Sequence, residues 1–220
     1  MARLHTLLFL RHGETTGQSS TRYWGSTDVP LSCLGQQQMR CAAAVVAPFN
    51  VCIVYTSTLS RTRDAAALVA PNVPSEAVAA FDEVHFGAWE GMTEAEIAAS
   101  HPDEYVRWKA RTDDFVYPGG ESLNAFRARV AEGLARVLDG PGPTALILSH
   151  RGVIVRSLSL LLGWERPRLT VALGSLHVIQ REGGSWQPVV LDRTDHLTSV
   201  SPTSDLVTAV DHPLKGKRSG

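Results

Sequence analysis

The chain has 220 residues, of which 44% are hydrophobic, and a formal net charge of -1 at pH 7. This length suits one α/β domain with a sizeable core, and the balanced charge gives no electrostatic case for binding nucleic acid or an acidic membrane. No apolar run approaches the roughly 18 to 20 residues of a membrane span. The apolar stretch near Met1 is too short for a signal peptide, because Arg11 and His12 interrupt it. We therefore expect a cytoplasmic protein.

The three cysteines are odd in number and lack both CxxC and metal-ligand spacing. They are Cys33, Cys41 and Cys52. We expect reduced, mostly buried thiols rather than a catalytic cysteine.

Strand and helix signals alternate through the first eighty residues. Ser32 would cap a helix that Pro48 stops, and Pro71 would end the next helix. Apolar runs between the helices predict strands. In chain order, the expected elements are a strand at Leu7–Leu10, a helix at Cys33–Ala47, a strand at Val51–Tyr55, a helix at Leu59–Ala70 and a short strand at Val73–Ala79.

The same alternation continues in the second half of the chain. Thr93 and Glu96 have the spacing of a capping box, and Pro102 suits the first turn of a helix. The expected elements are a short helix after Thr93, a helix from Pro102 towards Arg111, an amphipathic helix from Ser122 to Gly140, a strand at Ala145–Ser149, a helix at Val153–Leu162 and a hairpin of Ser175–Gln180 and Trp186–Leu191 around Gly183-Gly184. Residues 201–220 lack periodicity, which predicts a mobile C-terminal tail.

This order of elements predicts the α/β class. We expect a three-layer α/β/α sandwich with a mainly parallel sheet, covered by helices on both faces. One domain would span residues 1–200, with a short helical insertion at residues 84–118 over the active-site edge of the sheet. The aromatic and basic residues of this insertion could stack on a ring or pair with an acidic group. They could equally belong to an ordinary two-helix cover with solvated charges.

Two of the predicted strands run directly into a histidine and a glycine. The first ends in Arg11-His12-Gly13 and the second in His150-Arg151-Gly152, while a third strand leads towards Arg61. Because ligands bind at the carboxyl ends of strands in an open α/β sheet, we expect these side chains to meet at one edge. Arginine offers a fork of donors that suits phosphate oxygens, and histidine offers a nucleophile or a proton. The arrangement predicts phosphoryl transfer at a covalent histidine.

Each motif alone also has a simpler interpretation. His12 could be an accidental histidine at a solvated strand end, His150 a structural cap and Arg61 a surface arginine. Glu83, in a segment rich in aromatics and glycines, could be a general acid or a surface acid in a turn. A metal site of His12, Glu83 and His150 is disfavoured, because the flanking arginines would repel the cation.

Taken together, the segments resemble the histidine phosphatase superfamily, also called phosphoglycerate mutase-like, in its phosphatase branch. The resemblance extends over nearly all of Leu7–Leu197. The segments that carry it are Arg11-His12-Gly13-Glu14-Thr15, then Gly25, Asp28 and Pro30-Leu31-Ser32, then Ser57, Leu59, Arg61 and Ala65, then Glu83 with Phe86-Gly87 and Trp89-Glu90-Gly91, then Pro118-Gly119-Gly120-Glu121-Ser122, and finally Ser149-His150.

The resemblance implies a phosphomonoesterase that hydrolyses a small phosphorylated metabolite without a metal or another cofactor. His12 would attack phosphorus with a neutral ring. Arg11, Arg61 and a protonated His150 would bind the equatorial oxygens, and Glu83 would protonate the leaving alkoxide and then activate water. Phosphoglycerate mutase-type transfer and a catalytically silent phospholigand-binding protein are the alternatives.

Three departures from the family pattern concern substrate recognition. Gly17-Gln18 replaces a usual Trp-Asn pair, Arg151 stands where a glycine commonly follows the histidine, and an asparagine often found near Ala172–Ser175 is missing. We expect Gln18, Gly25 and Arg151 to bind substrate, with Arg151 either contacting a phosphate or carboxylate or pointing to solvent. Sugar phosphates, α-ribazole phosphate, phosphoglycerate and phosphorylated secondary metabolites stay open as substrates, and so does a homodimer.

Overall fold

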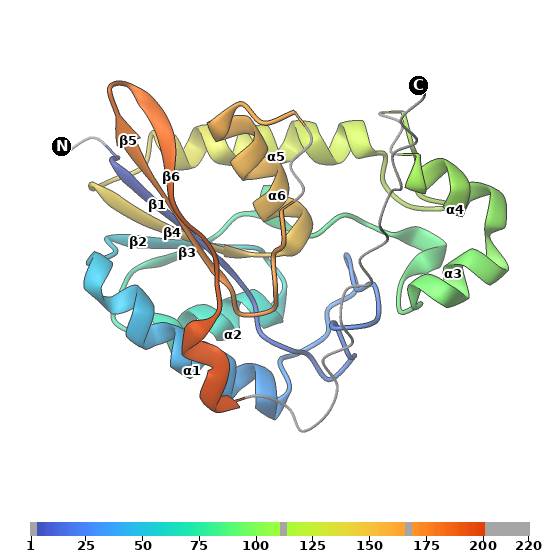
Figure 1. The fold of residues 1–220 in the computed structure, drawn as a ribbon, viewed down its shortest axis with the longest axis horizontal. Coiled ribbons are helices and arrows are strands. Elements are labelled where there is room, and N and C mark those ends of the chain that lie inside the picture. Colours follow the sequence, from blue (N-terminus) through green and yellow to red (C-terminus); the bar gives the residue numbers. More distant parts are fainter. Residues whose placement is uncertain (1–3, 111–113, 166–168, 201–220) are drawn as a thin grey trace, which may run out of the picture.

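The computed structural model describes residues 4–110, 114–165 and 169–200 (Figure 1). Its centre is a six-stranded sheet with the order β3-β2-β4-β1-β5-β6. The strands are β1 (Thr6–Arg11), β2 (Ile53–Thr56), β3 (Ser75–Ala77), β4 (Thr144–Ser149), β5 (Leu176–Glu182) and β6 (Ser185–Arg193). The first four pair in parallel, and β5 runs antiparallel to both β1 and β6. The predicted mainly parallel sheet is confirmed, with the predicted hairpin at one edge.

The sequences of the two central strands explain their position. β1 (TLLFLR) is buried except for its last residue, and β4 (TALILS) is buried throughout. Continuous apolar runs of this kind suit strands that are covered on both faces. Strand β6 lies at the edge of the sheet and is mostly exposed. Strands with polar side chains are usually found at such edges.

Helices cover both faces of the sheet, as the three layers in Figure 1 show. One face packs against α1 (Cys33–Val46) and α2 (Ser60–Val69), whose apolar side chains share a core with Leu8 and Leu146. The other face packs against α5 (Leu123–Leu138) and α6 (Arg151–Leu162) in a core that contains Phe9 and Ile147. The predicted three-layer sandwich is confirmed.

Local sequence signals set the helix ends. The side chain of Ser32 accepts a hydrogen bond from the amide of Gly35 at 3.1 Å, and Thr93 and Glu96 form the predicted capping box. Gly163 ends α6 with a φ of 70°, a left-handed conformation that glycine adopts without a steric penalty. The predicted helices are therefore present, with boundaries shifted by a few residues.

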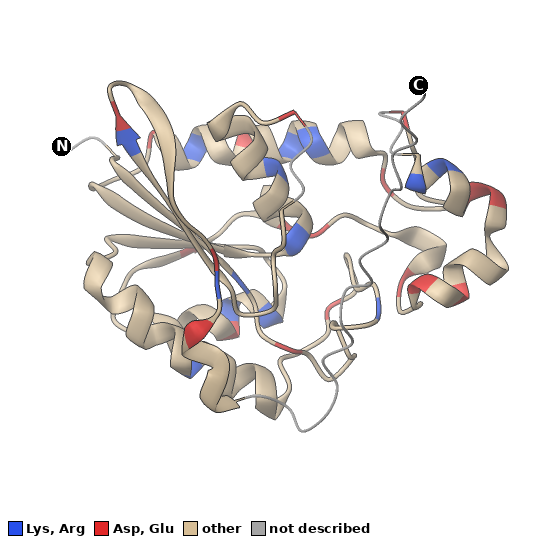
Figure 2. Ribbon diagram, in the orientation of Figure 1, with Lys and Arg blue, Asp and Glu red and all other residues tan. Residues whose placement is uncertain are grey.

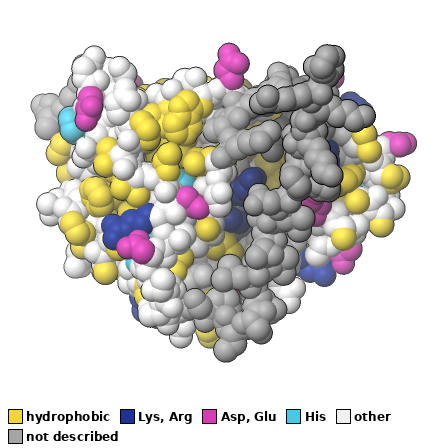
Figure 3. All heavy atoms as spheres, viewed as in Figure 1, with side chains coloured by type: hydrophobic (Ala, Val, Ile, Leu, Met, Phe, Trp, Pro, Cys, Tyr) yellow, Lys and Arg dark blue, Asp and Glu magenta, His cyan; other side chains and the backbone are white. Residues whose placement is uncertain are grey.

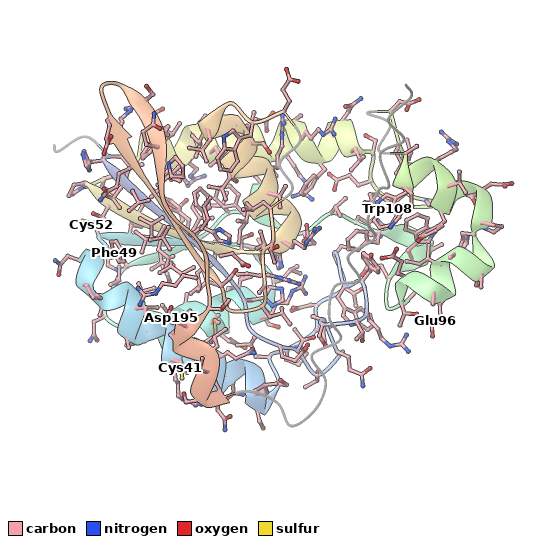
Figure 4. All side chains as sticks on the ribbon, viewed as in Figure 1. Cys41, Phe49, Cys52, Glu96, Trp108 and Asp195 are labelled. Carbon is pink, nitrogen blue, oxygen red and sulfur yellow. The ribbon has the colours of Figure 1, made fainter. Side chains whose placement is uncertain are left out.

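The part of the chain between β3 and α5 includes a helical cover at one end of the molecule. It contains α3 (Glu94–Ser100) and α4 (Pro102–Lys109), and Figure 4 shows Trp108 and Glu96 on this part of the fold. The fully buried Trp89 anchors the cover, because its ring packs edge-on against Trp108 and Tyr117 at centroid distances of 5.7 and 5.4 Å. Residue Arg111, to which we expected the second helix to run, lies outside the described residues.

The expectation of mostly buried cysteines is wrong. Cys33 and Cys52 are exposed and Cys41 is half-buried, and all three are free thiols. Figure 4 places Cys41 on α1, and Cys52 beside Phe49 near the C-terminal end of that helix. Cys33 and Cys41 both lie on α1, where the core face is taken by Met39 and Val46, so the thiols face outward.

The predicted tail at residues 201–220 lies outside the described residues. None of the helices in the described part of the chain is long and apolar enough to cross a membrane.

Candidate active site

The ends of β1 and β4 bring the two predicted histidines together. These strands are parallel neighbours with Arg11 opposite Ser149, so the residues that follow each strand meet at the same edge. The amide of His12 donates to the carbonyl of Ser149 at 3.1 Å. The rings of His12 and His150 lie edge to face, with centroids 5.1 Å apart. Both side chains are almost fully buried.

The hydrogen bond of His12 fixes which of its nitrogens can react. Nδ1 lies 2.7 Å from the carbonyl oxygen of Gly13, and a carbonyl can only accept, so Nδ1 carries the proton. Burial, with Arg61 and Arg11 nearby, lowers the pKa of His12 well below its usual 6.5. The ring is therefore neutral at pH 7, and the lone pair of Nε2 is available for attack.

His150 is held in one tautomer by a chain of side-chain hydrogen bonds. Nε of Arg61 donates to Nδ1 of His150 at 3.3 Å, so Nε2 carries the proton in the neutral ring and donates to Oγ of Ser57 at 2.8 Å. Burial and the charge of Arg61 lower the pKa of His150 well below 6.5. The described side chains thus favour a neutral His150, whereas we expected a protonated one. A phosphate dianion beside the ring would raise the pKa of His150 and favour its protonated form.

The guanidinium of Arg61 is fully buried and is held mainly by backbone carbonyls. It donates to Thr27 O at 2.9 Å, to Gly25 O at 2.8 Å and to Trp24 O at 3.3 Å, besides its bond to His150. These contacts place the cation behind the histidines but occupy most of its donors. Direct binding of phosphate by Arg61 would require one of them to be exchanged.

Glu90 fixes the loop that carries those carbonyls. Its carboxylate accepts hydrogen bonds from the amides of Gly25 and Ser26, at 3.0 and 3.1 Å, and from the amide of Phe86 at 3.0 Å. A Cβ at Gly25 would collide with the carbonyl of Val84. Gly25, which we expected to bind substrate, therefore sits between Glu90 and Arg61 as part of the support of the site.

Arg11 lies at the front of the site. One of its terminal nitrogens donates to Val171 O at 2.8 Å, while its Nε is buried and has no partner among the described residues. Burial and the charge of Arg151 lower the pKa of Arg11 to about 10, which leaves it charged at pH 7. An unpaired buried donor on a cation favours an anionic ligand.

Glu83 is attached to the first turn of α6. Its carboxylate accepts a hydrogen bond from the amide of Val84 and another from the amide of Gly152, both at 3.0 Å. A Cβ on Gly152 would collide with Oε1 of Glu83, so glycine is needed for this approach. Arg129 holds the preceding backbone, because it donates to the carbonyls of Asp82 and Glu83 and pairs with Glu121.

A cavity of about 760 Å³ opens in front of these groups. Among the residues we expected in the site, its lining includes Arg11, His12, Glu83 and Arg151. Arg61 and His150 are buried behind the lining. Gln18 is exposed and lies outside it, with a φ of 60°, and the neighbouring Ser19 and Ser20 line the cavity in its place. In the described residues there is no group of three or more His, Cys, Asp or Glu side chains that could hold a metal ion.

The cavity has both basic and aromatic walls. Figure 3 shows basic side chains next to hydrophobic ones near the middle of this face of the molecule. The aromatic lining comes largely from the cover and from the loop that it touches: Tyr23, Trp24, Phe86, Trp108, Tyr117 and Phe126.

Sequence reasoning missed the residues that support the site through the backbone. No periodicity or motif singles out Arg129, whose partners are carbonyls of a distant loop. Gly152 offered a signal, since a glycine near a strand-end histidine, here with Arg151 between them, often marks a close approach of other groups to the backbone.

Comparison with known proteins identifies the family. Residues 7–194 match the histidine phosphatase superfamily (branch 1). The chain is 32% identical over 201 residues to an acid phosphatase of Mycobacterium tuberculosis, covering 88% of this chain and 95% of that protein. The structure of the alpha-ribazole phosphatase from Shigella flexneri superposes with a TM-score of 0.75 at 25% identity, covering 86% of this chain and 96% of that one.

A third relative is longer than this chain. A bifunctional protein of Mycobacterium tuberculosis is 37% identical over 148 residues, which cover 66% of this chain and 40% of that protein. The chain thus matches less than half the length of that relative. Together the matches confirm the resemblance drawn from the motifs and the predicted fold class.

Proposed function

The chain belongs to the histidine phosphatase superfamily (branch 1), and we propose that it is a phosphomonoesterase that hydrolyses a small phosphorylated metabolite through a phosphohistidine at His12. One observation carries the proposal: the hydrogen bond from His12 to Gly13 O leaves Nε2 unprotonated in a ring that lines a cavity together with Arg11 and Glu83.

In the first step, Nε2 of His12 forms a bond to phosphorus as the bond from phosphorus to the ester oxygen breaks. The unpaired Nε–H of Arg11 and the first-turn amides of α6 stabilise the charge on the transferring oxygens. Glu83, protonated at this stage, gives its proton to the departing alkoxide. The alcohol leaves and the carboxylate of Glu83 is ionised.

In the second step, Glu83 takes a proton from water as the water oxygen bonds to phosphorus and the bond to Nε2 breaks. The two backbone amides that hold Glu83 keep its carboxylate in place for this proton transfer. His12 returns to its neutral state and inorganic phosphate is released. Splitting the reaction into two displacements is a general route to hydrolysis of a very unreactive bond.

Arg61 and His150 support the transferred group from behind His12. Their mutual hydrogen bond keeps both side chains in place, and the charge of Arg61 acts on the His12 ring. When the phosphate dianion binds, His150 takes up a proton at Nδ1, gives up the hydrogen bond that it accepts from Arg61, and becomes a donor to the phosphate. This restores the role that the sequence motifs imply for His150.

The substrate class follows from the cavity and from the relatives. Its volume of about 760 Å³ accommodates a metabolite rather than a folded protein chain. The relatives are named an acid phosphatase and an alpha-ribazole phosphatase, and we infer that this chain likewise hydrolyses a phosphate monoester. The three free thiols suit a reducing compartment, and we infer a cytoplasmic location.

The test is release of inorganic phosphate from a panel of phosphorylated metabolites. His12→Ala should abolish release while circular dichroism shows the same fold, because the nucleophile is lost. Near-normal turnover by the folded variant would contradict the mechanism. A protein that only binds phospholigands would release no phosphate from any of them.

Arg151 gives one reason to test mutase activity as well, because a guanidinium in the cavity could hold the carboxylate of phosphoglycerate. Incubation with 3-phosphoglycerate and a trace of 2,3-bisphosphoglycerate separates the two activities. Rapid conversion to 2-phosphoglycerate with little phosphate would establish a mutase, and phosphate release without isomerisation would establish the hydrolase.

A further inference from the structure

Arg151 is a cation at the site that neither chemical step uses. It is the first residue of α6, and the blue start of that helix is visible in Figure 2. The neighbouring His150 and Gly152 are fixed by their bonds to Ser57 and Glu83. The backbone of Arg151 is therefore held at the site, while its side chain is exposed and lines the cavity.

Of the other cations that line the cavity, two are paired with carboxylates, and Arg11 is the one that we assign to the transferring phosphoryl group. Arg22 pairs with Glu96 at 2.9 Å, Lys109 pairs with Glu94 at 2.9 Å, and Arg11 donates to Val171 O. The side chain of Arg151 has neither a hydrogen bond nor an ion pair with any residue in the described ranges. Its charge is thus available to a ligand.

The charge of Arg151 acts on the cover side of the cavity. It stabilises the phenolate forms of Tyr23 and Tyr117, although burial still raises the pKa of both. The cations that depress the pKa of His12 are Arg61 and Arg11. The guanidinium thus lines the cavity together with Tyr23 and Tyr117, and its charge also repels Arg11. An anion between the tyrosine wall and Arg11 would relieve that repulsion.

We propose that Arg151 binds a second acidic group, carried by the leaving group of the substrate. The enzyme would then select phosphate monoesters whose alcohol or phenol bears a carboxylate or a second phosphate. This proposal rests on the proposed function. A guanidinium fork binds carboxylate and phosphate alike. The flat faces of Tyr23, Trp108 and Tyr117, which line the same cavity, suit an organic framework that joins the two acidic groups.

Matched aryl esters test the selection. The value of kcat/KM is measured for 4-carboxyphenyl phosphate, for its neutral isostere 4-carbamoylphenyl phosphate, for 1,4-phenylene bisphosphate and for phenyl phosphate. The variants are Arg151→Gln, Arg151→Lys and, as a control, Arg107→Gln, which removes an exposed charge of α4 outside the cavity lining.

The wild-type enzyme should prefer at least one acidic ester over its neutral partner by about tenfold or more, the value of a charged hydrogen bond. Which acidic ester is preferred distinguishes a carboxylate from a second phosphate. In Arg151→Gln the preference should disappear through a rise in KM, with turnover of phenyl phosphate within about threefold of wild type. Arg151→Lys should retain part of the preference, and Arg107→Gln all of it.

Three results would overturn the proposal: a wild-type enzyme without preference, a preference that survives Arg151→Gln, or equal losses on all four esters. The last would mean that Arg151 binds the transferred phosphoryl group. Failure to hydrolyse any ester would instead contradict the proposed function. In that case calorimetry with 4-carboxybenzylphosphonate and benzylphosphonate, which cannot be hydrolysed, still decides the point. Equal affinity for these two ligands would overturn the proposal, and tighter binding of the first, lost in Arg151→Gln, would support it.

Discussion

The amide of Gly152 donates to Oε2 of Glu83 at 3.0 Å, and a side chain at residue 152 would occupy the space of the Glu83 carboxylate. The first turn of α6 therefore sets the position of the proposed general acid. Because His150 is the N-cap residue of the same helix, one helix end places both that acid and a histidine that we propose to contact the phosphate.

We predict that Gly152→Ala displaces Glu83 and slows turnover of alkyl phosphates by about 10²-fold, the lower end of what general acid catalysis contributes. The loss should appear in kcat, because the substrate still binds. Leu160→Ala, at an exposed position of the same helix, is the control and should leave kcat unchanged. Wild-type kcat in Gly152→Ala would show that the acid does not depend on this contact.

Glu83→Gln should affect substrates according to their leaving groups. An alkoxide needs a proton as it departs, whereas p-nitrophenolate leaves unassisted. We expect kcat to fall about 10² to 10⁴-fold for an alkyl phosphate and much less for p-nitrophenyl phosphate. Glu132→Gln, an exposed acid on α5, serves as the control. An equal loss on both substrates would assign Glu83 a purely structural role.

Arg129→Met should reduce both stability and activity. It removes an ion pair with Glu121 and leaves the carbonyls of Asp82 and Glu83 without a donor. We expect the free energy of unfolding to fall by about 2 kcal/mol, as is typical when a largely buried polar group loses its partner. Urea denaturation measures the change. Arg136→Met, which removes the more exposed pair with Glu76, should cost less than about 1 kcal/mol, and equal losses would refute the prediction.

Stability should fall as the pH drops below about 6.5. Burial lowers the pKa of His12 and His150 well below the usual value and that of His177 to about 4. These histidines are neutral in the folded protein. In the unfolded chain the pKa of a histidine is about 6.5, so below that pH the unfolded chain binds protons that the folded protein does not. The unfolded state then holds more protons, so each group contributes a loss of up to about 1.4 kcal/mol per pH unit.

Thermal unfolding followed by calorimetry between pH 7.5 and pH 5 checks this pH dependence. The melting temperature should be constant above pH 6.5 and should fall below that pH. His12→Gln should show a shallower decline than wild type, since one of the three groups is removed. A constant melting temperature across this range would contradict the burial of neutral histidines.

Much of the fold and of the central site can be predicted from the sequence. The apolar runs of β1 and β4, together with the glycines that follow His12 and His150, are enough to place both histidines at one sheet edge. These features are local, since strand length and the residue that follows a strand decide them. The neighbouring register of β1 and β4 then brings the two rings together.

The rest of the site depends on contacts between distant segments. The carbonyls that hold Arg61 come from a loop 34 to 37 residues away in the chain, and nothing in the local sequence indicates that its donors are so engaged. Gln18 is exposed and does not line the cavity, and its φ of 60° lies in the left-handed region, which the residue type did not indicate. The outward positions of Cys33 and Cys41 follow from which face of α1 meets the sheet, and we expected these thiols to be mostly buried because the local sequence does not show that face.

The central claim is that His12 carries the phosphoryl group during turnover. A rapid-quench experiment with a ³²P-labelled substrate, stopped in alkali, measures it directly. The account predicts radioactive phosphate on the protein that is stable in alkali, labile in acid, located at His12 and absent from His12→Ala. Release of phosphate at the wild-type rate with no label on His12 at any time point would contradict the account.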